Sequence, residues 1–293
     1  MRFQHPIFEI ILSRRSCRSF DQSPVLPEAR AILQAACTEL TSGLLAEPAR
    51  FAWLDLHSQD RKLSGGLIRN ASGLLVGGVQ ASRLAYTSYG YLMEQLVLKA
   101  TDIGLGTCWV ALFARELVSE FGPGPNDVCP AVVAVGNLPD RVSFRDRIIR
   151  AAARSDGRKP WSELFFRERD GSALNRSQAG TYAPALDMLQ LAPSAGNSQP
   201  WRVIKAVSAP VFHFYVRPTP HRYEKHPLHE VDIGIAACHF ELGARASGLA
   251  GRWQVLEPEY VPPLAHCSYI VTWFGDQSWR IPKQPGDSPE VTQ

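Results

Sequence analysis

Residues 89–109 read YGYLMEQLVLKATDIGLGTCW, and residues 233–253 read IGIAACHFELGARASGLAGRW. The two segments align without a gap at a constant offset of 144 residues, and both predict a long amphipathic helix that closes at a glycine and leads into a strand. A repeat at a fixed offset indicates two related units in one chain. Six residues recur at matching positions: Gly90, Leu98, Ala100, Gly104, Leu105 and Trp109 return as Gly234, Leu242, Ala244, Gly248, Leu249 and Trp253.

Weaker similarities flank this repeat in the same order. Two helix–strand units of any α/β protein could share a few residues by chance, but the common order of the flanking elements favours a duplication. The matched pairs are the predicted helices 28–37 and 184–191, the strand starts 48–51 and 200–203, and the buried strands 132–136 and 270–275.

The fold predicted from this repeat is of the α+β class. Two related halves, residues 1–165 and 166–280, are expected to pack through their long central helices as a pseudo-dimer with mixed sheets. Such a chain completes its own dimer-like interface, so we expect a monomer. Residues 281–293 read as a disordered tail.

Charge and composition exclude several classes of protein. The 293 residues carry 31 basic and 28 acidic side chains, a formal net charge of +3, and no basic tract typical of nucleic-acid binding. No apolar run reaches the roughly 18 residues of a membrane span, and residues 1–12 lack a signal-peptide pattern. The six cysteines show neither a C-x-x-C motif nor a zinc spacing. These features predict a cytoplasmic protein that binds a small molecule, without a structural metal, nucleic acid or membrane.

Two polar stretches differ between the halves. Residues 14–20 read RRSCRSF, and residues 192–201 read APSAGNSQPW. The region that should mirror the second stretch in the first half reads CTELTSG (37–43), and the region that should mirror the first stretch reads DGSAL (170–174). Each half lacks what the other keeps, as expected if a site at a dimer interface once occurred twice and one version survives.

The two stretches offer complementary chemistry. Arginine binds a phosphate dianion as a planar fork, and the Ser16 hydroxyl can donate beside it. Small residues at 194–196 allow close backbone approach, and the amides of Asn197 and Gln199 can pair with a flat polar heterocycle. Taken alone, Arg14 and Arg15 would be a solvated helix end, and Arg18 a surface arginine paired with Asp21. Together the two stretches predict a site for flavin mononucleotide (FMN).

These motifs resemble those of the nitroreductase superfamily, whose members carry R-x-S-x-[RK]-x-F and A-P-S-x-x-N-x-Q-P-W. Single-copy members are homodimers with FMN at the subunit interface, and this chain is similar to a fused branch that holds both halves. The resemblance covers most of residues 7–275 and implies one FMN per chain. It places Arg14, Arg15 and Ser16 at the phosphate and ribityl chain, and Arg18 at the N1–C2=O edge of the ring. It places Pro193, Ser194, Ala195, Asn197 and Gln199 on or behind the opposite wall, the strand with Thr107, Cys108 and Trp109 near N5, and Arg158 and Lys159 at the phosphate.

The resemblance also implies a reaction. An FMN-dependent oxidoreductase of this kind takes hydride from NAD(P)H at N5 and passes it to a small acceptor such as a nitroaromatic or a quinone. This ping-pong cycle needs positioning rather than a side-chain acid or base, so no catalytic residue is assigned. The alternatives are an FMN-dependent oxidase or dehydrogenase of a specific metabolite or peptide, and a flavin-binding protein without turnover.

Other motifs carry less weight. Gly104-x-Gly106 is followed by Trp109 where a third glycine would stand, so it is a poor dinucleotide fingerprint. His221, His226, His229 and Glu230 cluster without a zinc spacing, so a solvated loop or a substrate-facing lid is expected there rather than a metal site. His239 lies in an apolar run and is expected in the core or in a groove.

Overall fold

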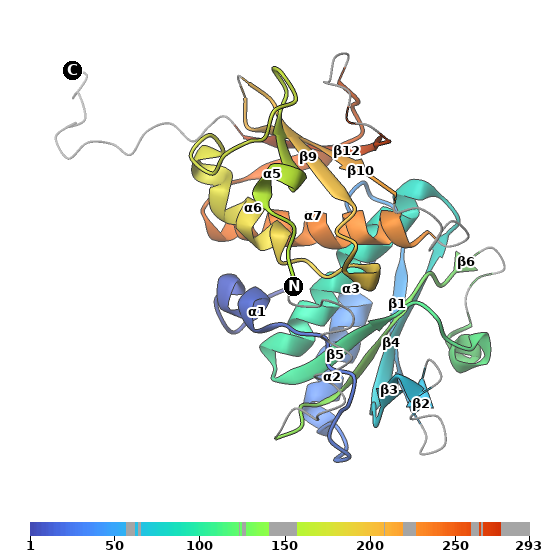
Figure 1. The fold of residues 1–293 in the computed structure, drawn as a ribbon. Coiled ribbons are helices and arrows are strands. Elements are labelled where there is room, and N and C mark those ends of the chain that lie inside the picture. Colours follow the sequence, from blue (N-terminus) through green and yellow to red (C-terminus); the bar gives the residue numbers. More distant parts are fainter. Residues whose placement is uncertain are drawn as a thin grey trace, which may run out of the picture.

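Two long helices, α3 (Arg83–Asp102) and α7 (Leu228–Ala246), pack against each other at the centre of the molecule (Figure 1). The computed structural model describes residues 1–56, 62–63, 66–122, 124, 127–140, 157–207, 209–218, 227–258, 264 and 266–276. The two sheets lie on opposite sides of this helix pair (Figure 1). The fold is α+β, as predicted.

The first sheet packs against α3. Its strands are antiparallel and follow the order β1-β4-β7-β5, with β6 paired to β4 at the side. A separate pair, β2 and β3, lies nearby. The strands are β1 (Arg50–Asp55), β2 (Lys62–Leu63), β3 (Ile68–Arg69), β4 (Gly73–Gln80), β5 (Leu105–Val110), β6 (Asp127–Val128) and β7 (Val132–Asn137).

The second sheet packs against α7 and has the order β11-β12-β10-β9-β8. Read from β9, the order β9-β10-β12-β11 corresponds to β1-β4-β7-β5 of the first sheet, and these strands are again antiparallel. β8 is added in parallel at the outer edge, so the predicted boundary between residues 165 and 166 falls inside this strand. The strands are β8 (Phe165–Arg167), β9 (Trp201–Lys205), β10 (Val211–Val216), β11 (Gly251–Gln254) and β12 (Ser268–Gly275).

Shorter helices cover the central pair and the sheet edges. α2 packs against β1 and α3, α6 packs along α7, and α1 contacts both central helices. These helices are α1 (Ile7–Ser13), α2 (Pro27–Glu39), α5 (Trp161–Leu164) and α6 (Ala183–Gln190), with 3-10 helices η2 (Arg115–Phe121), η3 (Gly180–Tyr182) and η4 (Ala195–Asn197).

Both central helices end in the way that the repeat predicts. Gly104 and Gly248 have φ angles of 81° and 76°, a left-handed conformation that glycine adopts without steric cost. The next residues, Leu105 and Leu249, are buried and lead into β5 and β11. The helix–glycine–strand prediction is therefore confirmed in both segments.

One large apolar cluster fills the space between the sheets and the central helices. Its largest fully buried side chains include Trp201, Trp273, Tyr89 and Phe240. A second cluster lies on the outer face of the first sheet and contains Phe20, which anchors the segment that follows the early arginines. No helix of the described residues is long and apolar enough to cross a bilayer.

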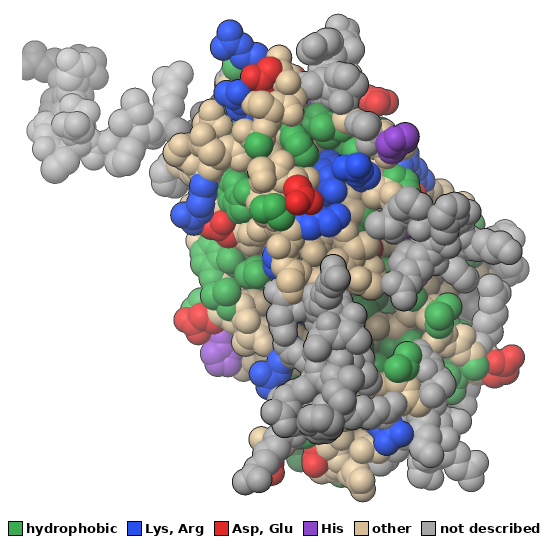
Figure 2. All heavy atoms as spheres, in the orientation of Figure 1, with side chains coloured by type: hydrophobic (Ala, Val, Ile, Leu, Met, Phe, Trp, Pro, Cys, Tyr) green, Lys and Arg blue, Asp and Glu red, His purple; other side chains and the backbone are tan. Residues whose placement is uncertain are grey.

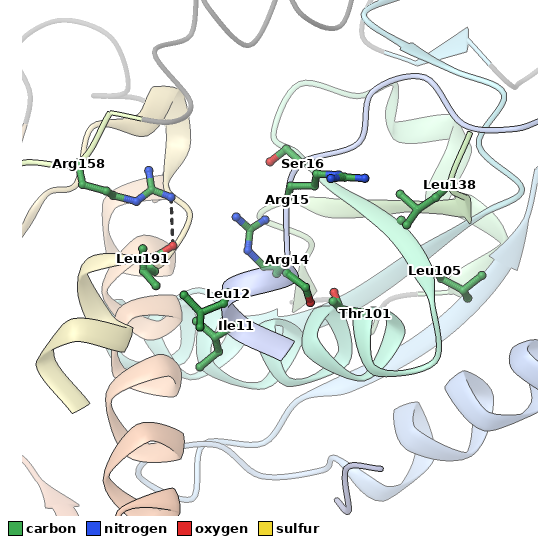
Figure 3. Close-up of a pocket in the computed structure, with 12 residues that line it drawn as sticks. Ile11, Leu12, Arg14, Arg15, Ser16, Thr101, Leu105, Leu138, Arg158 and Leu191 are labelled. Carbon is green, nitrogen blue, oxygen red and sulfur yellow. Dashed lines mark hydrogen bonds between the residues drawn. The ribbon is translucent and has the colours of Figure 1, made fainter. Parts of the chain in front are cut away.

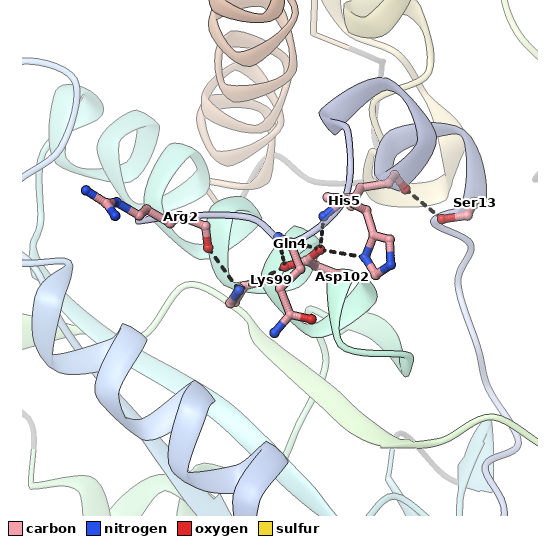
Figure 4. A network of polar contacts seen from close by, with 7 residues as sticks. Arg2, Gln4, His5, Ser13, Lys99 and Asp102 are labelled. Carbon is pink, nitrogen blue, oxygen red and sulfur yellow. Dashed lines mark hydrogen bonds and ion pairs between the residues drawn. The ribbon is translucent and has the colours of Figure 1, made fainter.

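A buried carboxylate ties the N-terminal segment to the end of α3 (Figure 4). Asp102 accepts the backbone N–H of Gln4 at 2.9 Å and that of His5 at 3.0 Å, and the Lys99 ammonium at 2.8 Å. Lys99 also donates to the Arg2 carbonyl at 2.9 Å. These contacts fix the chain just before α1, and α1 delivers Arg14 to the candidate site.

Candidate functional site

The arginine-rich segment leaves α1 in an extended conformation. Arg14 stands at the C-terminal end of the helix with φ −58° and ψ 127°. Ser16 then pairs in parallel with Thr107 of β5, where the Cys17 N–H donates to the Thr107 carbonyl at 2.8 Å. The Arg18 carbonyl accepts the N–H of Arg69 in β3 at 2.8 Å. The first sheet therefore holds this segment at both ends.

The loop between α6 and β9 folds as a tight polar turn. Gly196, Asn197 and Gln199 have φ angles of 58°, 54° and 48°, and the Gln199 N–H donates to the Ser194 hydroxyl at 2.9 Å. The Ala195 N–H donates to the carboxyl of Asp232 in α7, at 3.0 Å and 3.2 Å to its two oxygens. The loop is thus held to α7 through a backbone amide.

Arg158 links this loop to the chain before α5. Its guanidinium donates to the Asn197 side-chain oxygen at 2.8 Å and to the Leu191 carbonyl at 3.1 Å. The Asn197 amide donates in return to the Gly157 carbonyl at 2.7 Å. These bonds orient the Asn197 side chain and place the Arg158 cation beside the loop.

The two stretches, nearly 180 residues apart, face one cleft of about 290 Å³. Ten of the fourteen predicted site residues line it: Arg14, Ser16, Arg18, Cys108, Trp109, Arg158, Pro193, Ser194, Ala195 and Asn197.

A second cleft of about 640 Å³ adjoins the first, because Arg14, Ser16 and Arg158 line both. Arg15 lines only this second cleft. In Figure 3 the Arg14 and Arg158 side chains face the same space, whereas Arg15 lies on the side of Leu138. The cations therefore gather where the two clefts meet.

Three predicted site residues, Thr107, Lys159 and Gln199, line neither cleft. Thr107 is buried and pairs through its backbone with Ser16. Gln199 is buried behind the loop, where its side-chain oxygen accepts the Lys159 N–H at 2.8 Å. Thr107 and Gln199 therefore support the cleft from behind.

Lys159 belongs to a separate basic group. Burial lowers the pKa of its ammonium, and the nearby Arg202 and Arg217 lower it further against the opposing effect of Glu163. Figure 2 shows basic side chains around the position of α5, with an acidic side chain among them. Lys159 therefore lies beside the cleft, while its neighbour Arg158 lies within it.

The cleft is electrostatically uneven. Among the described residues, no ion pair joins Arg18 to Asp21, and the Asp21 carboxylate accepts the Ser23 N–H at 2.8 Å. The Nη1 of Arg18 is buried and has no hydrogen-bond partner within the described part of the chain. Burial of a donor without a partner is costly, so this nitrogen suits an acceptor atom of a ligand.

Large apolar side chains also line the cleft. Leu67 and Leu112 line it, although 51% and 67% of their surfaces are exposed. Large apolar side chains exposed at the mouth of a cleft favour contact with an apolar ligand. A flat molecule with a polar edge or tail would match both the cationic and the apolar side chains.

Sequence reasoning missed Asp232, Leu67 and Leu112. Asp232 lines the cleft, and burial raises the pKa of its carboxyl well above the usual range, although the Ala195 N–H works against this rise. The sequence feature that could have indicated Asp232 is its position as an acidic residue inside the apolar run at the start of α7. Leu67 and Leu112 carried no signal, because single exposed leucines are common on protein surfaces.

The described residues contain no group of three or more side chains that could hold a metal ion. His221, His226 and the predicted tail lie outside the described residues, whereas His229 lies in α7 and not in a loop. His239 is fully buried, in agreement with its predicted place in the core.

Known structures resemble this fold at low sequence identity. A "putative nitroreductase" from Thermotoga maritima matches with a TM-score of 0.61 at 18% identity, over 94% of this chain and 95% of that chain. Nitroreductase structures with bound FMN from Desulfitobacterium hafniense (TM-score 0.40, 17% identity) and from Desulfovibrio desulfuricans (TM-score 0.37, 19% identity) each cover 49% of this chain, and 97% and 95% of their own. No curated protein is similar enough to count as a relative.

The sequence itself decides the family. Residues 6–244 match the family model described as "Putative TM nitroreductase". The match includes both polar stretches, α3 and all of α7 except its last two residues. Both polar stretches and the start of α7 line the cleft. This chain is therefore a member of that nitroreductase family.

Proposed function

We propose that this protein is an FMN-dependent oxidoreductase. The observation that carries the proposal is the convergence of the Arg14–Arg18 segment and the Pro193–Asn197 loop on one cleft. Membership of a nitroreductase family supports it. FMN has a phosphate dianion at one end and a flat ring at the other, and both cationic and apolar side chains line the cleft.

The residues of the cleft fit such a ligand. Arg14, Ser16 and Arg158, at the junction of the two clefts, would hold the phosphate, with Arg15 close by. The buried Nη1 of Arg18 would donate to the polar edge of the ring. The remaining wall would come from Pro193, Ser194, Ala195 and Asn197. Asp232 holds the Ala195 N–H of this loop, and Arg158 holds the Asn197 side chain.

When bound, FMN would supply hydride transfer from NAD(P)H to a small acceptor such as a nitroaromatic or a quinone. The protein would contribute binding and orientation. The exposed Leu67 and Leu112 would receive a flat apolar acceptor at the mouth of the cleft, and Arg18 would stabilise negative charge on its ligand. No side chain is assigned a catalytic role.

We also propose that the chain is a duplicated, pseudo-dimeric unit that functions as a monomer. The equal strand order of the two sheets and the paired central helices support this. Each half supplies one wall of the cleft, so a single chain would hold a complete site. Sedimentation velocity should then give a particle of 32.4 kDa, whereas a stable dimer would count against this part of the proposal.

The first experiment is an absorbance spectrum of the freshly purified protein, with any released cofactor identified by mass. We expect a flavin spectrum and the mass of FMN. A colourless protein that cannot be reconstituted with FMN would remove the proposal and its flavin-based alternatives together.

The second experiment separates a reductase from those alternatives. The holoprotein is mixed with NADH or NADPH without oxygen, and the flavin absorbance is followed. Bleaching by either nucleotide supports the reductase. If neither bleaches the flavin, the protein is an oxidase or dehydrogenase of another substrate or a flavin-binding protein without turnover. A predicted cytoplasmic location would give it access to NAD(P)H.

A further inference from the structure

Trp109 joins the wall of the cleft to the buried face of α3. It lies on β5 and lines the cleft. Its indole N–H donates to Oε2 of Glu94 at 2.8 Å. The Glu94 side chain projects from α3 and is fully buried. The orientation of the indole therefore depends on a carboxyl group inside the protein.

His239 completes this contact from the other central helix. Its Nε2 lies 2.9 Å from Oε1 of Glu94, and its Nδ1 lies 3.1 Å from the Met188 carbonyl oxygen. A carbonyl oxygen only accepts, so Nδ1 carries a proton. The contact between Nε2 and Glu94 needs one further proton. It forms the hydrogen bond whether that proton sits on Nε2 or on the Glu94 carboxyl group. With the indole as the donor, both carboxyl oxygens and both ring nitrogens are satisfied.

The matching tryptophan of the other half is held in a similar way. Trp253 donates its indole N–H to Oε2 of Glu241 in α7 at 2.7 Å, and Tyr91 of α3 donates to the same oxygen at 2.7 Å. Each tryptophan thus binds a glutamate of its own central helix, and that glutamate binds a residue of the other central helix. Arg245, a largely exposed cation, pairs with Glu241 at 2.5 Å.

The two sets of contacts differ in what they face. Trp109 lines the cleft, whereas Trp253 is not among its described lining residues. Glu94 and His239 have no exposed surface, so removing one leaves a buried polar group of the other unsatisfied. The unsatisfied group can find a new partner only if the Trp109 side chain or the helices rotate, and either movement changes the wall of the cleft.

We propose that Glu94 and His239 are positioning residues of the flavin cleft, which fix the Trp109 indole in its wall through a contact between the two central helices. The inference rests on the proposed function, because the ligand of the cleft is taken to be a flavin. It adds that the fit of the ring depends on a contact between the two halves, remote from the arginine-rich segment.

The test is the dissociation constant of FMN for apoprotein variants, measured by flavin fluorescence quenching. Glu94→Gln keeps an acceptor for the indole and a donor for His239, so it should stay close to wild type. Glu94→Leu should weaken binding by about tenfold, the equivalent of one lost hydrogen bond. Glu241→Leu is the matched control, because it removes the same kind of contact away from the cleft, and it should leave FMN affinity nearly unchanged.

A double-mutant cycle shows whether Glu94 acts through Trp109. If it does, Glu94→Leu added to Trp109→Phe should weaken binding little beyond Trp109→Phe alone. Should Glu94→Leu fail to fold, His239→Gln takes its place in the cycle. Additive losses, or equal losses from Glu94→Leu and Glu241→Leu, would overturn the proposal.

A second measurement needs no flavin. The Trp109 indole resonance in a ¹H–¹⁵N spectrum, identified by its absence in Trp109→Phe, should move in Glu94→Gln and stay in place in Glu241→Gln. An unmoved resonance in Glu94→Gln would contradict the contact. A wild-type protein that binds no FMN would sink the proposed function itself, whereas FMN binding unaffected by every variant would sink the positioning role alone.

Discussion

Gly90 and Gly234 each lie against the backbone of the opposite central helix. A side-chain carbon added to Gly90 would overlap the Val231 carbonyl oxygen, and one added to Gly234 would overlap the Thr87 carbonyl oxygen. Val231 and Thr87 are separated by the same 144 residues as the two glycines. The contact is therefore self-complementary, like the interface of a symmetric dimer, and it supports the proposed duplication.

Replacing Gly234 with alanine should destabilise the protein. Alanine favours a helix over glycine by about 1 kcal/mol, but the added methyl group must push the backbones apart, which typically costs about 1–3 kcal/mol and more where backbone is hit. We expect a net loss in the free energy of unfolding, measured by urea denaturation with circular dichroism. Gly243→Ala in the same helix is the comparison, because its nearest neighbours would lie at 3.0–3.2 Å. A Gly234→Ala protein as stable as Gly243→Ala would contradict the close crossing.

Replacing Asp102 with asparagine should loosen the N-terminal segment. Burial alone would raise the pKa of Asp102, but the bonds from Lys99, Gln4 and His5 outweigh it, and the pKa is lowered. A lowered pKa in the folded state stabilises the protein above the unfolded value of about 3.9, and this contribution is lost as the pH falls below it.

At pH 7, Asp102→Asn should lower the free energy of unfolding by about 3–5 kcal/mol, because Lys99 loses its buried partner. Urea unfolding of both proteins between pH 3 and pH 7 measures it, and the difference should shrink toward pH 3. His5→Ala removes one partner that is largely exposed and serves as the mild control. A difference that stays constant over this range would show that the carboxylate charge does not matter.

Much of this architecture could be predicted because it depends on local sequence patterns. The glycine-terminated helices, the buried strands and the two polar stretches all follow from residue spacing. Placing the two stretches at one cleft required the repeat as well, because motifs 180 residues apart carry no distance information.

The rest depends on partners that spacing does not reveal. Glu94 and His239 are polar residues within apolar helices, and the sequence shows only that such residues need a partner. Their partner lies in the other half of the chain. β8 joins the second sheet although the predicted boundary falls inside it, because edge pairing depends on which strand is exposed. Lys159 could not be separated from its neighbour Arg158 without knowing where Arg202 and Arg217 lie.

Asp232→Asn should change the pH dependence of stability in the opposite direction to Asp102→Asn. Burial raises the pKa of the Asp232 carboxyl, and the neighbouring Glu230 adds to the rise. The folded protein then resists ionisation that the unfolded chain accepts, so wild-type stability falls as the pH rises above about 3.9. Asparagine keeps an acceptor for the Ala195 N–H and has no charge.

The stability of wild type relative to Asp232→Asn should therefore decrease from pH 4 to pH 7, by about 1.4 kcal/mol for each unit of pKa difference titrated. Urea unfolding of the apoprotein at several pH values measures this slope. A relative stability that rises with pH would mean that Asp232 is held as a carboxylate in the folded state.

Asn197→Ala should weaken FMN binding, although Asn197 lies in the other half of the chain from Arg14. The Asn197 side-chain oxygen accepts from Arg158 at 2.8 Å, and its amide donates to the Gly157 carbonyl at 2.7 Å. Their loss should raise the dissociation constant by about tenfold. Because φ is 54° at this position, alanine also strains the backbone. Asn197→Gly removes the side chain without that strain, so equal weakening by both variants assigns the effect to the amide. Wild-type affinity in both would mean that the halves do not share a site.

Arg18→Ala should lower both the affinity and the reduction potential of the bound flavin. The buried Nη1 of Arg18 has no partner in the described part of the chain, so a ligand edge in the cleft can receive its hydrogen bond. A cation beside a ring that gains negative charge on reduction stabilises the reduced form more than the oxidised form. A charge-assisted bond of about 1.5–3 kcal/mol corresponds to a fall of about 30–60 mV for a two-electron couple. Spectroelectrochemical titration measures this fall, and Arg18→Lys, which keeps the charge but not the fork, should recover part of it. If the alanine variant binds flavin more weakly but titrates at the wild-type potential, Arg18 contacts the ligand away from the part of the ring where charge develops.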